Sequence, residues 1–201
     1  LVFTDRAGHA GEIARDAAGC GLIVAAGGDG TIHEIVNSMN LDAQALALIP
    51  LGTGNGLTKN LGIRSARKAA EILGQGKVSP IDLMRCEIRI DDAWINRYAV
   101  TTATFGFASN AAIVSCRYFR PLRAFCYPVG ATVALCAQKG NRGAIAVDGP
   151  PLGTVRFTNL MVNNSVYSGN VPVFPRASLD DAALDILIAE ANPFSQLLHN
   201  V

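Results

Sequence analysis

The stretch Leu22-Ile23-Val24-Ala25-Ala26-Gly27-Gly28-Asp29-Gly30-Thr31 decides how this chain is organised. Its apolar first half predicts a buried strand, and its glycine-rich second half predicts a tight turn, after which a helix begins at Thr31. The N–H groups of such a turn can approach a phosphate closely, and the helix N-terminus adds favourable partial charge. A carboxylate in this turn would repel phosphate unless a cation lay between them, so Asp29 implies Mg²⁺. The structural alternative is an ordinary turn between a strand and a helix.

A second glycine-rich loop, Pro50–Gly56 (PLGTGNG), follows another apolar run, Ala45–Ile49. Two loops of this kind at the ends of successive strands predict that the chain binds a nucleotide. Neither loop ends in the glycine-lysine-serine/threonine of a Walker A loop, and neither fits the dinucleotide pattern GxGxxG. In the structural alternative, the Thr53 hydroxyl satisfies its own loop and Asn55 caps a helix over residues 56–61.

Strands and helices alternate through residues 1–83. A strand is expected at Leu1–Phe3, a helix at Gly11–Ala18 with Ile13, Ala14, Ala17 and Ala18 on one face, and a further helix at Ser65–Leu73. This alternation predicts a parallel sheet with helices on both of its faces. Ligands of such sheets bind at the carboxyl ends of the strands, which is where both glycine loops fall.

From about Pro80 the pattern changes to long strands joined by tight turns. One helical insertion is expected at about residues 121–137. The pairs Asp91-Asp92 and Asp148-Gly149 predict hairpin turns. The strands expected around them are Met84–Ile90, Trp94–Thr104, Ala144–Val147, Thr154–Asn163 and Leu184–Ala189. The predicted fold is therefore an α/β N-terminal domain with a parallel sheet, residues 1–80, followed by a mostly antiparallel β-sandwich domain, residues 81–201.

The composition indicates a folded protein with a sizeable core. Of the 201 residues, 50% are hydrophobic and 16% are charged, and the net charge of +1 gives no general attraction to nucleic acid or anionic membranes. No apolar run approaches the roughly 20 residues that cross a bilayer. The five cysteines form no CxxC pair, so buried free thiols in a reducing cytoplasm are expected. We expect no nucleic-acid partner.

Five motifs follow one another along the chain: Gly27–Thr31 (GGDGT) with Glu34 after it, Pro50–Asn55 (PLGTGN), Ile81–Leu83 (IDL), Phe105–Phe107 (FGF) and Ala177–Asp185 (ASLDDAALD). In this order they resemble the diacylglycerol, sphingosine and ceramide kinases, a family of lipid kinases. The first motif alone is shared with NAD kinases, which are the enzyme alternative. A non-catalytic nucleotide-binding module, or an inactive fragment, is the alternative from another class.

The resemblance implies the NAD kinase/diacylglycerol kinase-like fold and an ATP-dependent lipid kinase. Such an enzyme transfers the γ-phosphate to a hydroxyl of a diacylglycerol-like or sphingoid lipid, so its implied partners are ATP, Mg²⁺ and a lipid at a membrane surface. The expected location is the cytoplasm, peripheral to the membrane, and a homodimer is left open. The resemblance also implies that the family's domains begin before Leu1 and continue past Val201, where the general base lies. The chain alone is therefore expected to be inactive.

The resemblance assigns site residues one by one. Asp29 is the catalytic residue, acting through Mg²⁺, and the role of Thr4 beside the nucleotide rests on the resemblance alone. Glu34 fits a capping box with Thr31, with a direct nucleotide role as the alternative, and His33 is expected to be exposed. The residues implied to bind ATP are Thr4, Gly27, Gly28, Asp29, Gly30, Thr31, Gly52, Thr53 and Asn55.

Two further features are expected to contribute. A second Mg²⁺ site is implied at Asp181 with the carbonyl oxygens of Ser178 and Ala183, an all-oxygen set that suits a hard cation. Ala182 stands where the family usually has glycine, and a solvated turn is the alternative. The arginines and aromatic residues of Arg117–Tyr127 predict contact with a lipid surface, the alternative being rings packed inward beside solvated arginines.

Overall fold

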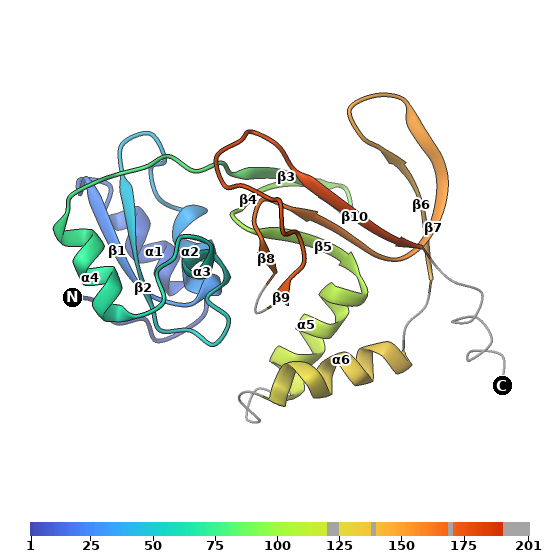
Figure 1. The fold of residues 1–201 in the computed structure, drawn as a ribbon, viewed down its shortest axis with the longest axis horizontal. Helices are drawn as coiled ribbons and strands as arrows, with labels where there is room; N and C mark the ends of the chain where they lie inside the picture. The colour runs from blue at the N-terminus through green and yellow to red at the C-terminus, as the bar shows by residue number, and fades with distance from the viewer. Residues whose placement is uncertain (120–124, 138–139, 169–170, 191–201) are drawn as a thin grey trace. The chain divides into compact units, whose positions relative to one another are not determined.

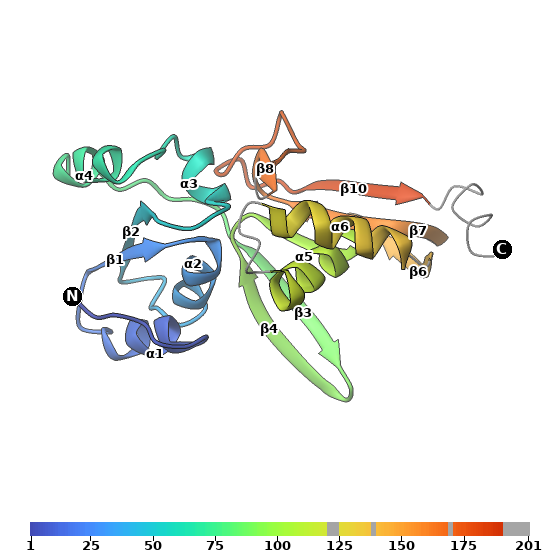
Figure 2. The same ribbon diagram turned by 90° about the horizontal axis from the view of Figure 1, so that it is seen from below.

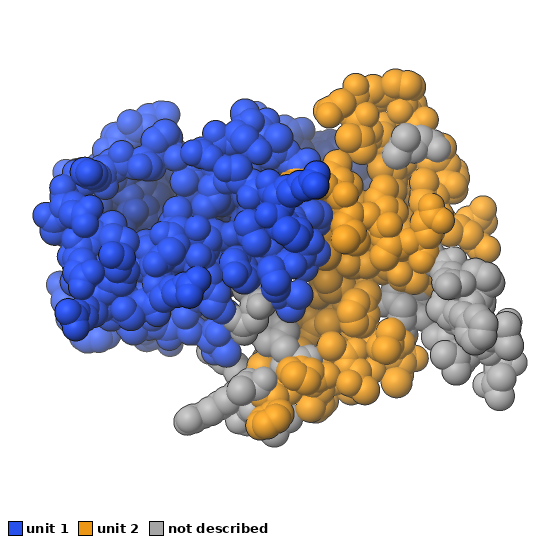
Figure 3. Space-filling view, viewed as in Figure 1, with its two compact units in different colours: residues 1–102, 163–184 blue, residues 103–162, 185–201 orange. Residues whose placement is uncertain are grey.

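The computed structural model describes residues 1–119, 125–137, 140–168 and 171–190. It divides the chain into two compact units (Figures 1 and 3), one of residues 1–102 and 163–184 and one of residues 103–162 and 185–201. This division differs from the predicted boundary at residues 80 and 81. The first unit also contains the strands that directly follow residue 83, and it includes residues 163–184 from late in the sequence.

A parallel sheet forms the centre of the first unit, as predicted. Strand β1 (Leu22–Gly27) pairs with β2 (Ala45–Pro50) in a register that runs from Leu22 opposite Ala45 to Gly27 opposite Pro50. Figure 2 shows helices α1 (His9–Asp16) and α2 (Asp29–Val36) on one side of this sheet and α4 (Ala66–Gly74) on the other. The expected helices on both faces are therefore present, and the carboxyl ends of β1 and β2 lie at the same edge.

Helix α1 (His9–Asp16) begins earlier than predicted and buries a different face. Its buried residues are Ala10, Gly11 and Ala14, whereas Ala18 is exposed. A Cβ on Gly11 would lie 3.1 Å from the Glu34 carbonyl oxygen of α2 (Asp29–Val36) and 2.7 Å from the Ser38 Oγ, so this close contact favours a very small residue. Close helix packing, rather than apolar content, selects the buried face.

The sequence overestimates the burial of the first strands. In β1 only Ala25 is buried, and Leu22 and Val24 are each 46% exposed. Leu1–Phe3 belong to no strand, and their side chains are exposed. Among the described residues this sheet contains only β1 and β2, so one edge and part of one face of β1 have no covering element. Apolar content therefore predicted strand formation in β1 but not its burial.

Two short helices follow β2 in the first unit: α3 (Gly56–Asn60) and α4 (Ala66–Gly74). The Ser65 side chain caps α4 by accepting a hydrogen bond from the Lys68 N–H at 3.1 Å. The core of the unit is built from buried residues of these helices, of the sheet and of the segments around them: Ala10, Ala14, Ala25, Ile32, Ile35, Val36, Leu48, Leu57, Ile63, Ala69 and Val100.

The hairpin of β3 (Met84–Ile90) and β4 (Ala93–Ala99) belongs to the first unit and turns at Asp91, whose φ is 53°. Asn37, directly after α2, holds the hairpin like a strand neighbour: its Oδ1 accepts from the Tyr98 N–H at 2.8 Å, and its Nδ2 donates to the Tyr98 carbonyl at 2.9 Å. The strand predicted over residues 94–104 is interrupted between β4 and β5 (Thr102–Gly106).

Two asparagines, Asn164 and Asn60, attach the late segment to the rest of the first unit. Asn164 donates its N–H to the Thr101 carbonyl at 2.8 Å and its Nδ2 to the Asp82 carbonyl at 2.8 Å. Asn60 of α3 accepts from the Val166 N–H at 2.9 Å, just before the short strand β8 (Tyr167–Ser168), which pairs with β9 (Val171–Pro172). These bonds explain why residues 163–184 do not stay with the second unit.

The second unit contains the predicted antiparallel sheet. Its strand order is β10 (Asp185–Glu190), β7 (Pro151–Asn163), β5, and β6 (Asn141–Ala146) pairs antiparallel with β7. The turn between β6 and β7 contains Asp148, with a φ of 48°, as the hairpin signal predicted. The fold class is thus confirmed.

Two helices pack together in the second unit, although the sequence predicted one. Helix α6 (Cys126–Cys136) matches the expected insertion, and α5 (Phe107–Tyr118) was missed. A Cβ on Gly130 would lie within 2.8 Å of the Ser115 Cα, so the two helices cross at a glycine. The buried pair Ala111 and Ser115, four residues apart, was the available helical signal. No described helix is both long and apolar enough to span a bilayer.

The cysteines are free, but the expectation that they are buried is wrong. Cys20, Cys116 and Cys136 are exposed, and Cys86 and Cys126 are half-buried. Burial raises the pKa of the Cys86 thiol, so this cysteine stays protonated at neutral pH.

Candidate functional site

The two glycine loops touch each other at the carboxyl ends of β1 and β2. The Leu51 N–H donates to the Gly27 carbonyl at 3.0 Å, which continues the pairing of the strands into the loops. A Cβ on Gly52 would lie 2.4 Å from the Gly28 Cα, and a Cβ on Gly28 would lie 2.9 Å from the Gly52 Cα. Both glycines are therefore required by the approach of one backbone to the other.

Asp29 links the first loop to the helix that follows the second loop. Its Oδ2 accepts from the Gly56 N–H at 3.0 Å, and its Oδ1 accepts from the Leu57 N–H at 3.2 Å. The carboxylate thus caps α3 from the first turn of α2, where its charge is also favoured by the partial positive charge of both helix N-termini. Helix α2 begins at Asp29, two residues before the predicted start at Thr31.

Asn55 and Lys59 stabilise the second loop. The Asn55 side chain accepts from the Gly52 N–H at 3.0 Å and donates to the Gly52 carbonyl at 2.7 Å. Although Asn55 occupies the N-cap position of α3, its side chain does not cap the helix, because Asp29 does so. The Lys59 ammonium donates to the Gly54 carbonyl at 2.7 Å. The loop is therefore held at both ends before any ligand binds.

Gly30 differs from the other loop glycines. A Cβ at Gly27 would meet the Thr31 side chain at 2.7 Å, whereas a Cβ at Gly30 would have no neighbour within 4 Å. Gly30 lies in the exposed first turn of α2, and its φ is not in the left-handed region. Neither backbone conformation nor packing in the described structure requires glycine here. The open space beside Gly30 lies at the N-terminus of α2, where a helix can bind an anion.

The remaining residues implied to bind ATP lie near solvent. Thr53 is exposed within the second loop, and Thr4 is exposed in the irregular segment before α1. His33 is exposed, as expected. The structure gives Thr4 no contact that would place it beside the glycine loops, so its role stays a prediction.

Glu34 has a structural contact, but not the predicted one. Its carboxylate accepts from the Gly8 N–H at 2.9 Å and from the Ala10 N–H at 3.2 Å, and so caps α1. The capping box with Thr31 is wrong because α2 begins at Asp29, which places Thr31 inside the helix. The contact spans 24 to 26 residues of sequence, so no local pattern could have predicted it.

Replacing Glu34 by alanine is expected to lower the free energy of unfolding by about 1–2 kcal/mol, because α1 loses both cap acceptors. Nucleotide affinity is expected to stay unchanged, because the carboxylate is used by α1. Urea unfolding and calorimetric titration with ATP and Mg²⁺ measure the two quantities. A fall in affinity without a fall in stability would instead assign Glu34 to the nucleotide.

The loop implied to hold a second metal is built around hydrogen bonds to three aspartates. The Ala182 N–H donates to the Asp82 Oδ2 at 2.7 Å, and the Ala183 N–H donates to the Asp181 Oδ1 at 3.1 Å. The Ser178 hydroxyl donates to Asp180 at 2.6 Å. Within the described residues, no group of three or more His, Cys, Asp or Glu side chains could hold a metal ion. The site with one aspartate and two carbonyls stays a prediction.

Ala182 adopts a left-handed conformation, with a φ of 54°. At residue 182 the backbone of this exposed loop therefore adopts a conformation that glycine favours, although the residue is alanine. Replacing Ala182 by glycine is expected to raise the free energy of unfolding by about 0.5–1 kcal/mol, because the strain at Cβ disappears. The same change at Ala183, where φ is not positive, is expected to lower it by about 0.5 kcal/mol. Paired thermal unfolding of both variants checks the difference in sign.

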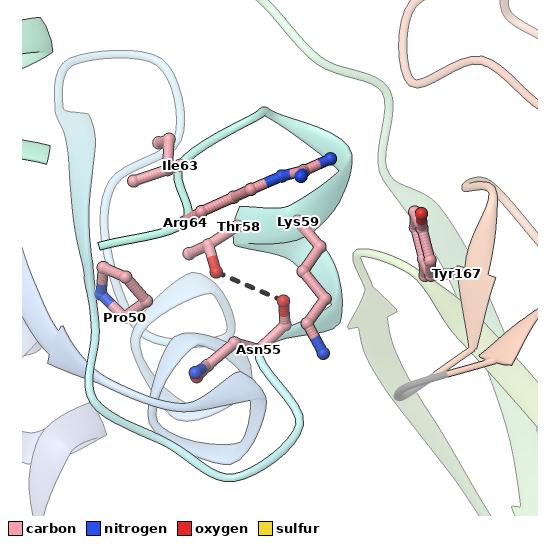
Figure 4. Close-up of a pocket in the computed structure, with 7 residues that line it drawn as sticks. All are labelled: Pro50, Asn55, Thr58, Lys59, Ile63, Arg64 and Tyr167. Carbon is pink, nitrogen blue, oxygen red and sulfur yellow. Dashed lines mark hydrogen bonds between the residues drawn. The ribbon is translucent and has the colours of Figure 1, made fainter. Parts of the chain in front are cut away.

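A pocket of about 340 Å³ lies beside the second glycine loop (Figure 4). In Figure 4 Tyr167, from β8, lies across from the residues of α3. Thr58 is fully buried and donates its hydroxyl to the Asn55 carbonyl at 3.2 Å. The sequence analysis did not predict the basic residues of this pocket. For Lys59 a signal was available, because it lies four positions after Asn55, on the helix that follows the loop. The lining residues are Pro50, Asn55, Thr58, Lys59, Ile63, Arg64 and Tyr167.

Asp29 can hold a metal ion in addition to capping α3. A carboxylate offers about four acceptor positions, and the two N–H groups of α3 use two of them. The open space at Gly30 adjoins the same helical turn. The residues present thus fit a phosphate–Mg²⁺ group, with backbone N–H donors for the phosphate and carboxylate oxygen for the ion.

Comparison with known proteins agrees with this geometry. Residues 1–86 match the diacylglycerol kinase catalytic domain family. The chain is 31% identical to a diacylglycerol kinase of Bacillus subtilis (strain 168), with 92% of this chain and 61% of that protein covered. It is 26% identical to a diacylglycerol kinase of Mycobacterium tuberculosis (strain ATCC 25618 / H37Rv), with 90% of this chain and 59% of that protein covered.

The fold also matches a solved structure. The crystal structure of a diacylglycerol kinase from Bacillus anthracis str. Sterne superposes with a TM-score of 0.69 over 98% of this chain and 62% of that chain, at 22% identity. The chain therefore spans about three fifths of the length of these relatives. The resemblance drawn from the ordered motifs is confirmed by the match of residues 1–86 to the diacylglycerol kinase catalytic domain family and by the similarity to the diacylglycerol kinases named above.

Proposed function

We propose that this protein is an ATP-dependent lipid kinase. It transfers the γ-phosphate of ATP to a hydroxyl of a diacylglycerol-like or sphingoid lipid: the bond between the β–γ bridging oxygen and the γ-phosphorus breaks, a bond to the lipid oxygen forms, and ADP and a proton are released. The observation that carries the proposal is the pair of glycine loops in contact at the carboxyl ends of β1 and β2, with open space at Gly30.

The loops are arranged to bind phosphates without rearranging. Phosphoryl transfer depends mainly on positioning and on stabilising charge. Asn55 and Lys59 already hold the second loop, and Asp29 fixes α3 against the first loop. Gly30 leaves the first-turn N–H groups of α2 accessible to a phosphate oxygen. Thr53, exposed in the second loop, and Thr4 are proposed to contact the same nucleotide.

Asp29 is proposed as the carboxylate that binds Mg²⁺, through its remaining acceptor positions. Such an ion would stabilise the negative charge of the phosphates. The carboxylate's own part is positional: two backbone donors fix its orientation, so that its free lone pairs point in a constant direction. A second ion at Asp181, with the carbonyls of Ser178 and Ala183, is part of the same proposal.

The second unit is proposed to meet the lipid. Helix α6 contains no charged residue, and Phe125, Val133 and Leu135 are exposed on it or just before it. On α5, the Arg117 guanidinium lies 5.5 Å from the centre of the exposed Tyr118 ring. Exposed apolar residues beside arginine and tyrosine are typical of a surface that contacts a bilayer interface. Residues 120–124 of the predicted stretch lie outside the described residues. Peripheral attachment to the cytoplasmic side of a membrane follows as part of the proposal.

The test is transfer of labelled γ-phosphate from ATP by the natural full-length protein. Diacylglycerol, sphingosine and ceramide in mixed micelles are offered in parallel with free NAD. Label in a lipid supports the proposal and identifies the acceptor class. Label in NAD would contradict it in favour of an NAD kinase, and ATP binding without any label would indicate a non-catalytic module.

A further inference from the structure

The pocket beside α3 has positive charge at its rim and no negative charge. Lys59 and Arg64 both line it, and none of its lining residues is an aspartate or a glutamate. Within the described part of the chain, the Arg64 guanidinium has no hydrogen-bond or ion-pair partner. An exposed arginine without a carboxylate partner can present its planar fork of donors to an anionic ligand.

The charge around this pocket is concentrated in one short segment. Residues 59–77 carry a net charge of +4, five basic side chains against the single acidic Glu71, whereas the whole chain carries +1. Arg67 pairs with Glu71 at 3.3 Å, and Lys68 lies 3.5 Å from the same carboxylate. The positive charge that is not offset by Glu71 therefore lies mainly at the pocket rim and at Lys77. The basic residues of the segment are Lys59, Arg64, Arg67, Lys68 and Lys77.

The walls of the pocket are apolar and aromatic. Pro50 and the buried side chain of Ile63 form one part, and the half-buried Tyr167 lies across from α3 (Figure 4). A volume of about 340 Å³ holds more than a bare phosphate ion. The lining suits a phosphate group that carries a small organic body, with the phosphate at the cationic rim and the body against the ring.

We propose that this pocket binds the phosphate group of a phosphomonoester or phosphodiester other than the nucleotide, carried either by a lipid headgroup or by a soluble compound. The site is separate from the glycine-loop surface assigned to ATP: Asn55 is common to both, but its side chain is occupied by both backbone groups of Gly52. Lys59 connects the two sites, because its ammonium donates to the Gly54 carbonyl of the second loop and the residue also lines the pocket. A phosphate bound in the pocket therefore lies beside the lysine that positions the second loop.

The test compares two variants that each remove one positive charge from the same segment. Arg64→Gln changes the pocket rim, and Arg67→Gln changes a residue that is already paired with Glu71. Co-sedimentation is measured with vesicles of phosphatidylglycerol and phosphatidylcholine and with vesicles of phosphatidylcholine alone. Arg64→Gln is expected to lower partition onto the anionic vesicles about fivefold, and Arg67→Gln less than twofold. Equal losses would show a diffuse electrostatic attraction and would overturn the pocket.

Two further measurements identify the source of the phosphate and the part played by the pocket wall. Glycerol 3-phosphate is titrated calorimetrically at constant ionic strength and in the presence of saturating ADP. If the pocket accepts soluble ligands, this compound is expected to bind the wild type and to bind Arg64→Gln at least fivefold more weakly. Binding to vesicles without binding of glycerol 3-phosphate assigns the site to lipid headgroups. Tyr167→Leu, which keeps every charge, is expected to weaken whichever probe binds. Unchanged binding in that variant, or binding of neither probe to the wild type, would overturn the proposal.

Discussion

Replacing Gly52 by alanine is expected to lower the free energy of unfolding by about 3 kcal/mol and to abolish nucleotide binding. The new Cβ would lie 2.4 Å from the Gly28 Cα and 2.8 Å from the Asn55 Oδ1. The nearest atom belongs to backbone that is fixed by the pairing of β1 with β2, so the loops must separate. Separation also breaks the bonds by which Asn55 holds Gly52.

The matched control is Gly30→Ala, in the partner loop. A Cβ there meets nothing within 4 Å, and alanine favours the helix by about 0.5–1 kcal/mol. Chemical denaturation of both variants gives the two free energies. If Gly52→Ala unfolds within about 0.5 kcal/mol of the wild type, the close contact of the two loops is not a feature of the folded protein.

Replacing Asp29 by asparagine is expected to affect stability and nucleotide binding separately. The amide keeps one acceptor but turns an N–H₂ group toward one of the two α3 donors, so about 1–2 kcal/mol of stability is lost. The loss of charge is expected to weaken the Mg²⁺-dependent binding of ATP at least about tenfold, since carboxylate is the favoured ligand of a hard cation.

The two effects are told apart by the alanine variant. Asp29→Ala removes both caps and is expected to lose about 2–3 kcal/mol, more than Asp29→Asn, while both lose the Mg²⁺ dependence. Denaturation curves and titrations with ATP, with and without Mg²⁺, measure the two properties in parallel. Unchanged ATP affinity would exclude the metal role, and unchanged stability would exclude the capping role.

Local patterns in the sequence predicted the elements that rest on local physics. The apolar runs before the glycine loops became β1 and β2, and the hairpin turn at Asp91 was signalled by two adjacent aspartates. The ordered motifs predicted the similarity to diacylglycerol kinases that residues 1–86 show. These predictions succeeded because turn chemistry and strand formation depend on neighbours in sequence.

The contacts that organise the site could not be predicted in this way. Asp29 caps α3 across 27 residues, and Glu34 caps α1 across 24 to 26 residues. Each carboxylate sits in or near a local motif that suggests another partner, but tertiary packing supplies better-placed N–H groups. Burial was misjudged for a related reason: Gly11 is buried because its small size allows close contact with α2, not because it is apolar.

The most direct test of the central claim is the affinity of Gly30→Ala for ATP with Mg²⁺, measured by calorimetric titration beside its thermal unfolding. If the first turn of α2 receives the phosphates, the added methyl group occupies their space, and affinity falls at least about tenfold while the unfolding temperature stays equal or rises. Wild-type affinity in a variant that is as stable as the wild type would contradict the account, because the phosphates would then bind elsewhere.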